Sequence, residues 1–139
     1  MTPPFPKKLV AVMNEKIEPG VIMNSLAHIC IAFGAQVGLE ALHLTQYVDA
    51  DGGVHVSSAM PFIILKANSN KIRELRKQAS SDPEMQYVDF IHTMTGGTYQ
   101  EQVERSKQTK DADLTYYGIV LYGTWDRVAE LTKKFSLWK

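Results

Sequence analysis

A continuously apolar segment, Leu9-Val10-Ala11-Val12-Met13, lies close to the start of the chain. A strand with one face in water alternates between apolar and polar residues, whereas a strand covered on both faces does not. The segment therefore predicts a strand over Lys8–Met13 with helices on both of its faces. Such strands belong to α/β proteins, so this segment restricts the fold class more than any other part of the sequence.

The second long apolar segment predicts a helix. Pro19-Gly20 opens it, because proline is favoured in the first turn of a helix, and it runs from Val21 to about Phe33. Either Gly34 or Gly38 can end it, since glycine readily adopts the left-handed conformation found after helices. The helix is expected to be too short and too interrupted by polar residues to span a membrane, which takes ~20 apolar residues.

Two short strands around a turn follow the helix. A three-residue loop, Asp51-Gly52-Gly53, would pair Val48 with Val56 and Leu44 with Met60. This register puts the apolar side chains on one face and places Asp49 opposite His55 on the other. We expect this hairpin to make the sheet mixed rather than purely parallel.

Strands and helices alternate along the rest of the chain. Strands are predicted over 62–65, 87–91 and 116–122, the last of them ended by Gly123, with a short extended segment over 135–138. Asn68 or Ser69 caps a helix that Asp82-Pro83 ends, and Ile72, Leu75 and Ala79 form its buried stripe. Thr98 with Glu101 forms a capping box, and Thr124 caps the final helix.

These elements predict one domain over residues 1–139, with an extended lead-in over 1–7. The fold class is α/β, a three-layer α/β/α sandwich with a mixed sheet. The apolar content of 45% is too high for a disordered chain. Fifteen Lys and Arg balance fifteen Asp and Glu, which makes nucleic acid an unlikely partner because its binding surfaces are basic.

Asn24 and His28 are the strongest candidates for chemistry. They lie four residues apart on one face of an otherwise apolar helix, near its start and beyond the carboxyl end of a strand. His28 is a candidate acid or base, and Asn24 a candidate ligand for a carbonyl or oxyanion. Asn14, Gly20 and Ser25 are candidate ligand-binding residues beside them. The alternative is structural, with His28 bonded to a backbone carbonyl in the core and Asn24 acting as a local cap.

A second candidate is the turn at Gly96, Gly97 and Thr98, which follows a strand and opens a helix, so that its N–H groups could hold an anion. The alternative is a plain turn. The histidines are scattered and Cys30 is the sole cysteine, so neither a metal site nor a cofactor is expected. One cysteine also excludes a disulfide framework. The single cysteine, and the lack of a visible leader sequence, favour a cytoplasmic location and no membrane partner.

The order of the elements resembles that of the type 2 peptidyl-tRNA hydrolases. The segment Gly20-Val21-Ile22-Met23-Asn24-Ser25-Leu26-Ala27-His28 is similar to that family's Gly-Lys-(Ile/Val)-Ala-Ala-Gln-x-x-His segment, and 61–67 and 122–138 are similar to its later parts. The family's lysine is Val21 here, its glutamine is Ser25, and its Asp-Ala-Gly-Arg-Thr turn has no counterpart near 93–98. The chain more closely resembles an uncharacterised bacterial domain-of-unknown-function family, number two thousand, which has an Asn-x-x-x-His helix and a hydrolase-like fold.

Three functions remain open from the sequence. The first is a protein of hydrolase-like fold that lacks the hydrolase activity and has a site for a small polar molecule at the start of its first helix. The second is a peptidyl-tRNA hydrolase with His28 as its base. The third is a non-enzymatic dimerisation or regulatory domain, whose hairpin, with Tyr47 and Val54–Val56 near a sheet edge, pairs with a second copy to form a homodimer.

Overall fold

The computed structural model describes residues 5–139, so part of the expected lead-in, residues 1–4, lies outside the described residues. A five-stranded mixed sheet has the strand order β5-β6-β1-β4-β7. The strands are β1 (Lys7–Asn14), β4 (Phe62–Ala67), β5 (Gln86–Ile91), β6 (Tyr116–Thr124) and β7 (Ser136–Leu137). Strands β1 and β4 are parallel, whereas β6, β5 and β7 pair antiparallel with their neighbours.

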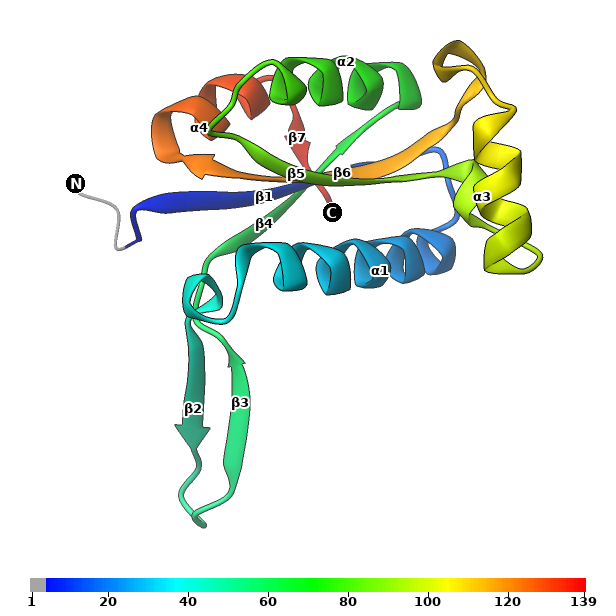
Figure 1. Ribbon diagram of the computed structural model, residues 1–139. Coiled ribbons are helices and arrows are strands. Elements are labelled where there is room, and N and C mark those ends of the chain that lie inside the picture. The colour runs from blue at the N-terminus through cyan, green and yellow to red at the C-terminus, as the bar shows by residue number, and fades with distance from the viewer. Residues whose placement is uncertain (1–4) are drawn as a thin grey trace.

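Helices cover both faces of this sheet, which gives the three layers that the sequence predicts (Figure 1). Helix α1 (Pro19–Val37) lies on one face, and α2 (Ser69–Ser80) and α4 (Trp125–Thr132) lie on the other. The position of β1 between the two helix layers explains its continuous apolar sequence. Val10 and Val12 belong to the core under α2 and α4, while Leu9, Ala11 and Met13 belong to the core under α1.

Helix α1 extends past the predicted end near Phe33, to the second of the two glycines that were expected to end it. It continues through Gly34 and ends at Gly38, whose φ of 85° is a conformation that suits glycine. With 19 residues it is long and apolar enough to cross a membrane by length and composition, contrary to the expectation that it is too short. Only 22% of its most apolar stretch is buried in the structure, where Ile22, Ile29 and Phe33 face the sheet.

The hairpin differs most from its prediction. Strands β2 (Leu44–Val48) and β3 (Val54–Ser58) form a separate two-stranded sheet that projects from the end of α1, so they are not why the main sheet is mixed (Figure 1). Val48 pairs with Val54 and Leu44 with Ser58, so the predicted register is wrong. The loop spans 49–53 and is closed by the Asp49 N–H, which donates to the Gly53 carbonyl at 2.9 Å. We call residues 44–58 the arm.

The helix caps follow the sequence in part. Asn68 accepts from the Lys71 N–H at 2.9 Å, and the predicted stripe of α2 is buried. Thr98 accepts from the Glu101 N–H at 3.2 Å at the start of α3 (Tyr99–Lys107). Thr124 precedes α4 without a side-chain cap bond, and β6 continues past Gly123, so these two predictions are wrong. Single 3₁₀ turns at 40–42, 92–94 and 111–113 complete the chain.

Candidate functional site

The start of α1 leaves backbone donors available. Glu18 occupies the cap position without a side-chain cap bond, and Pro19 has no N–H to satisfy. The first intrahelical bond runs from the Ile22 N–H to the Glu18 carbonyl at 3.0 Å. The N–H groups of Gly20 and Val21 therefore point out of the helix, in the region where its dipole favours an oxygen atom or an anion.

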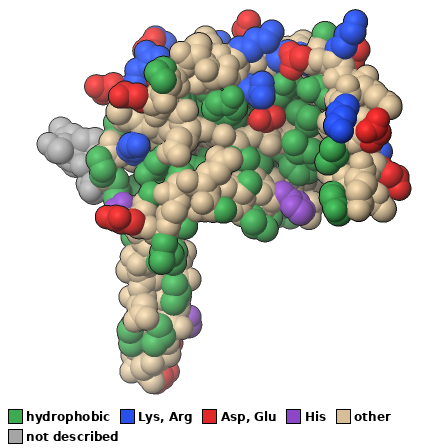
Figure 2. Space-filling view, viewed as in Figure 1, with side chains coloured by type: hydrophobic (Ala, Val, Ile, Leu, Met, Phe, Trp, Pro, Cys, Tyr) green, Lys and Arg blue, Asp and Glu red, His purple; other side chains and the backbone are tan. Residues whose placement is uncertain are grey.

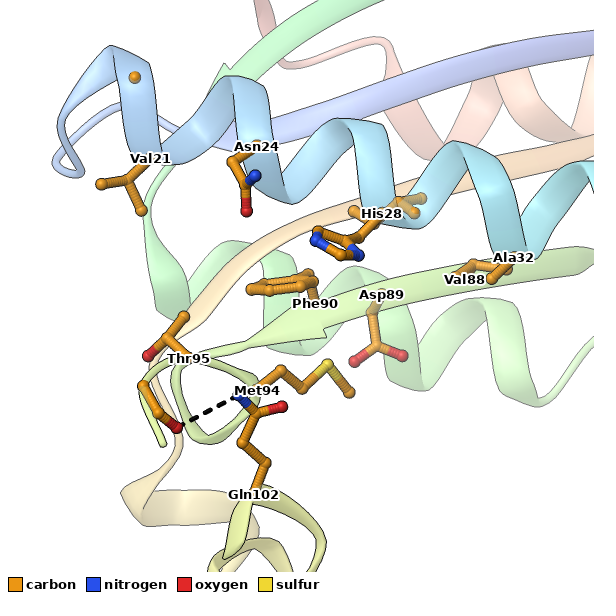
Figure 3. A pocket seen from close by; sticks show the side chains of 13 residues that line it. Val21, Asn24, His28, Ala32, Val88, Asp89, Phe90, Met94, Thr95 and Gln102 are labelled. Carbon is orange, nitrogen blue, oxygen red and sulfur yellow. Dashed lines mark hydrogen bonds between the residues drawn. The ribbon is translucent and has the colours of Figure 1, made fainter. Parts of the chain in front are cut away.

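Asn24 and His28 extend this region along the helix. Both side chains are exposed and point from α1 toward the ring of Phe90 on β5 (Figure 3). The imidazole of His28 and the ring of Phe90 have centroids 6.1 Å apart and planes inclined by 33°. Neither the core position predicted for His28 as the alternative nor the capping role predicted for Asn24 is found here.

An open groove of about 780 Å³ runs between α1, the edge strand β5 and the segment 94–102. Its lining is mostly apolar, with Val21, Ile29, Ala32, Val88, Phe90 and Met94 as its apolar side chains. Its polar side chains are those of Asn24, His28, Asp89, Thr95 and Gln102. An apolar groove with a few convergent polar groups is typical of a small-molecule site.

Side chains of α3 hold the loop at the far wall by hydrogen bonds. Gly96 and Gly97 have φ values of 73° and 72°, a conformation in which a side chain would be strained. Arg105 of α3 donates to the carbonyls of Thr93 at 3.2 Å and Gly96 at 3.1 Å, and also to that of Thr95. Gln102 donates to the Gly96 carbonyl at 3.2 Å, the one bond drawn in Figure 3.

The groove carries little charge. Asp89 is the one acidic residue in its lining, and its carboxylate accepts from Arg76 of α2 at 3.1 Å. The lining contains no Lys or Arg. Cys30, also on α1, is half-buried, and burial raises the pKa of its thiol, so it is a poor nucleophile at neutral pH. Within residues 5–139, no three His, Cys, Asp or Glu side chains come together as metal ligands do.

The comparisons with known proteins give a family for this chain and a solved structure of similar fold. A family described as "Protein of unknown function (DUF2000)" matches residues 7–139. The chain belongs to this family. The DUF2000 chain is also similar to a solved structure of a protein of unknown function from Agrobacterium tumefaciens strain C58, with 19% identity and a TM-score of 0.80. That match covers 97% of this chain and 99% of the other, and no curated protein matches the sequence.

The groove of this DUF2000 protein brings together four of the eight candidate residues. Gly20, Asn24, His28 and Gly96 line it. Ser25 is buried and donates to the Val21 carbonyl at 2.9 Å, while Gly97 and Thr98 lie outside the lining and Thr98 serves as a helix cap.

Asn14 has a structural role instead. Its amide donates to the Tyr116 carbonyl at 2.8 Å, and its oxygen accepts from the Lys16 N–H at 2.8 Å, so this buried side chain is satisfied away from the groove. The sequence reasoning missed Arg105 and Gln102, which organise the loop. The available signal was that both follow the Gly96-Gly97 pair on the next helix.

Proposed function

We propose that this DUF2000 protein binds a small polar molecule with an apolar portion in the groove beside α1. One observation carries the proposal: Asn24 and His28, one turn apart, expose their side chains toward the same groove (Figure 3). Figure 3 draws no hydrogen bond from either side chain to the other residues that line the groove. Polar groups that converge on an apolar cavity in this way are available to a ligand.

The lining favours a particular ligand chemistry. The N–H groups of Gly20 and Val21 and the Asn24 amide suit a carbonyl or carboxylate oxygen. Phe90 and Met94 suit an aromatic or aliphatic body beside it. Because the lining contains no Lys or Arg, a phosphate-rich ligand is not favoured.

The absence of Lys and Arg from the groove lining also weighs against peptidyl-tRNA hydrolysis. Tight binding of an RNA needs several cations along its phosphates. The basic residues of α2, including Lys71, Arg73 and Lys77, lie on the opposite face of the sheet from the groove (Figure 1). The fold itself we propose to be hydrolase-like, and the parallel pairing of β1 with β4 and the closing β6-α4-β7 segment support this relationship. A cytoplasmic location, supported by the single cysteine, completes the proposal.

The test is a screen of small amides, carboxylic acids and aromatic acids against the isotope-labelled full chain by NMR. Ligands that bind are expected to shift the amide signals of residues 20–28 and 95–97. Their affinity is expected to fall at least tenfold, about 1.4 kcal/mol, in Asn24→Ala and in His28→Ala. Gln36→Ala is the matched control, because it removes an exposed amide from the same helix outside the groove.

The proposal fails if the ligands found shift signals elsewhere, or if their affinities are the same in wild type and both groove variants. Turnover of esters or amides is not expected. The one carboxylate in the lining, that of Asp89, pairs with Arg76 rather than orienting the imidazole of His28.

A further inference from the structure

The arm exposes an unusual amount of apolar surface. Among its 15 residues, 44–58, Thr45 is partly covered and the other 14 are exposed. Its large apolar side chains, Leu44, Tyr47, Val48, Val54 and Val56, are between 49% and 63% exposed. A two-stranded hairpin with nothing packed on it is marginally stable in water. The arm therefore needs a surface to cover it.

The outer face of α1 continues this apolar surface. Met23 is 69% and Ile31 is 73% exposed, with the small Ala27 between them, and Leu39 at the end of the helix is 72% exposed. Residues 17–65 contain none of the fifteen Lys and Arg, and in Figure 2 the arm shows no blue atoms. Residues 19–39 also contain no Asp or Glu, and such depletion of charge is typical of the core of a protein–protein interface.

A complementary patch lies at the other end of α1, on α3 (Figure 1). Tyr99, Val103 and Lys107 follow one another at four-residue spacing and so form one ridge of that helix. Tyr99 is 71% and Val103 is 52% exposed, and with Met94 they border a hollow of about 460 Å³. The ridge is thus apolar at its start and basic at its end.

The arm, like the α3 ridge, has apolar residues followed by charged residues, here of the opposite sign. Its strands carry the valines, and its tip carries Asp49 and Asp51. The Asp49 carboxylate is occupied within the tip, because it accepts from the Asp51 and Gly53 N–H groups, each at 2.9 Å, and contacts His55 at 2.8 Å. The Asp51 carboxylate is the acidic group that a cation could meet.

We propose that the arm of one molecule packs on the α3 ridge of a second copy, and that the reciprocal contact closes a two-fold dimer. A two-fold axis that sets the outer faces of two α1 helices against each other, antiparallel, moves each arm from its own end of α1 to the partner's α3 end (Figure 1). Val48 and Val54 then cover Tyr99 and Val103, and Asp51 approaches Lys107. The arm with the exposed residues of α1 and α3 supplies the ~20–30 residues a side of a standard interface.

A membrane is the other surface that could cover the outer face of α1. The charged residues around this face favour a protein partner over a membrane. Peripheral membrane helices carry Lys and Arg toward anionic headgroups, and residues 17–65 have neither. The arm tip is acidic, which opposes its insertion between anionic lipids. Ile22, Ile29 and Phe33 already hold the inner side of α1 on the sheet.

The test is sedimentation velocity of the full chain over a range of concentrations. The wild type is expected to dimerise, and Tyr99→Glu to raise the dissociation constant at least tenfold. Tyr47→Glu is the control, because Tyr47 lies on the opposite face of the arm from Val48 and its variant should dimerise as the wild type does. Circular dichroism checks that each variant is folded.

A charge exchange tests the register of the arm. Asp51→Lys and Lys107→Asp are each expected to weaken the dimer about fivefold, and the double variant to regain most of the loss. A monomeric wild type, equal effects of Tyr47→Glu and Tyr99→Glu, or no recovery in the exchanged pair would each overturn the proposal. So would a monomer that floats with phosphatidylcholine–phosphatidylserine vesicles, which would assign the α1 face to a membrane.

Discussion

The imidazole of His28 lies over Phe90, 6.1 Å between ring centroids, and this pair joins the middle of α1 to the edge strand of the sheet. Phe90 is 7% exposed and belongs to the core beneath α1, whereas His28 is exposed above it. The boundary between core and groove therefore runs between these two rings. Residues above it can be changed for function with little effect on folding.

The first prediction concerns that boundary. Replacing both Asn24 and His28 by Ala is expected to lower the free energy of unfolding by no more than ~3 kcal/mol, and by about 0.5 kcal/mol each because both side chains are exposed. Asn14→Ala is expected to cost about 1–3 kcal/mol, because it leaves the buried Tyr116 carbonyl without its donor. Urea unfolding of the three variants provides the measurement. A larger loss in the double variant than in Asn14→Ala would make the pair structural.

The second prediction concerns two glycines. A Cβ at Gly118 would meet the Met13 sulfur, and Met13 is fully buried, so Gly118→Ala is expected to cost about 1–3 kcal/mol through overpacking. A Cβ at Gly20 meets nothing within 4 Å in the first turn of α1, so Gly20→Ala should be neutral or stabilise by up to ~1 kcal/mol. Thermal and urea unfolding of the two variants and the wild type measure these changes in stability. Equal costs at the two positions would contradict the packing around Met13.

The third prediction concerns the loop at the groove. Arg105→Ala removes the donor shared by three carbonyls of residues 93–96 and is expected to cost about 1.5–3 kcal/mol. Hydrogen exchange at residues 95–98 should speed up, while exchange in β1 should change only as far as overall stability does. Glu104→Ala, an exposed change on the same helix, is the control. Unchanged exchange in the loop would show that Arg105 does not hold it.

The fourth prediction concerns alkaline pH. Burial, followed by donation to Asp111, raises the pKa of Tyr116 to about 12, against ~10 in an unfolded chain. The folded protein therefore holds this proton more tightly. The resulting stability is fully present below pH ~10 and is lost as the pH rises from 10 toward 12.

The measurement is urea unfolding at several pH values for the wild type and Tyr116→Phe, with Tyr47→Phe as an exposed control. The stability of Tyr116→Phe is expected to fall less steeply between pH 10 and 12 than that of the other two proteins. Parallel curves for all three would mean that Tyr116 titrates normally.

The sequence predicted the main elements because the spacing of apolar residues in each one reflects which of its faces are buried. Strand β1 is continuously apolar from Leu9 to Met13 because helices cover both its faces, and α2 shows its stripe at Ile72, Leu75 and Ala79. The hairpin register failed because the face pattern could not decide it. The observed register differs from the predicted one by two residues, and side chains alternate with a period of two, so both registers put the same apolar side chains on one face.

The sequence predicted those parts of the candidate site whose residues are close together in the chain. It did not predict the parts that the fold brings together from distant segments. Asn24 and His28 share a helix face, which spacing alone reveals. Asn14 looked similar, yet its amide is satisfied by Tyr116, 102 residues away in the chain. The bonds of Arg105 to the loop depend likewise on how α3 folds back, which residue spacing does not encode.

The arm also has a consequence for how this family can diverge. It enters the chain between α1 and β4 and is closed at its base, where the Ala59 N–H donates to the His43 carbonyl at 3.0 Å. The sheet and both cores are complete without it, because none of the core residues lies within 44–58. Mutations in the arm are therefore freed from the constraints of the interior. If the arm forms the dimer proposed above, the choice of partner can drift, or be redesigned, while the groove beside α1 stays as it is.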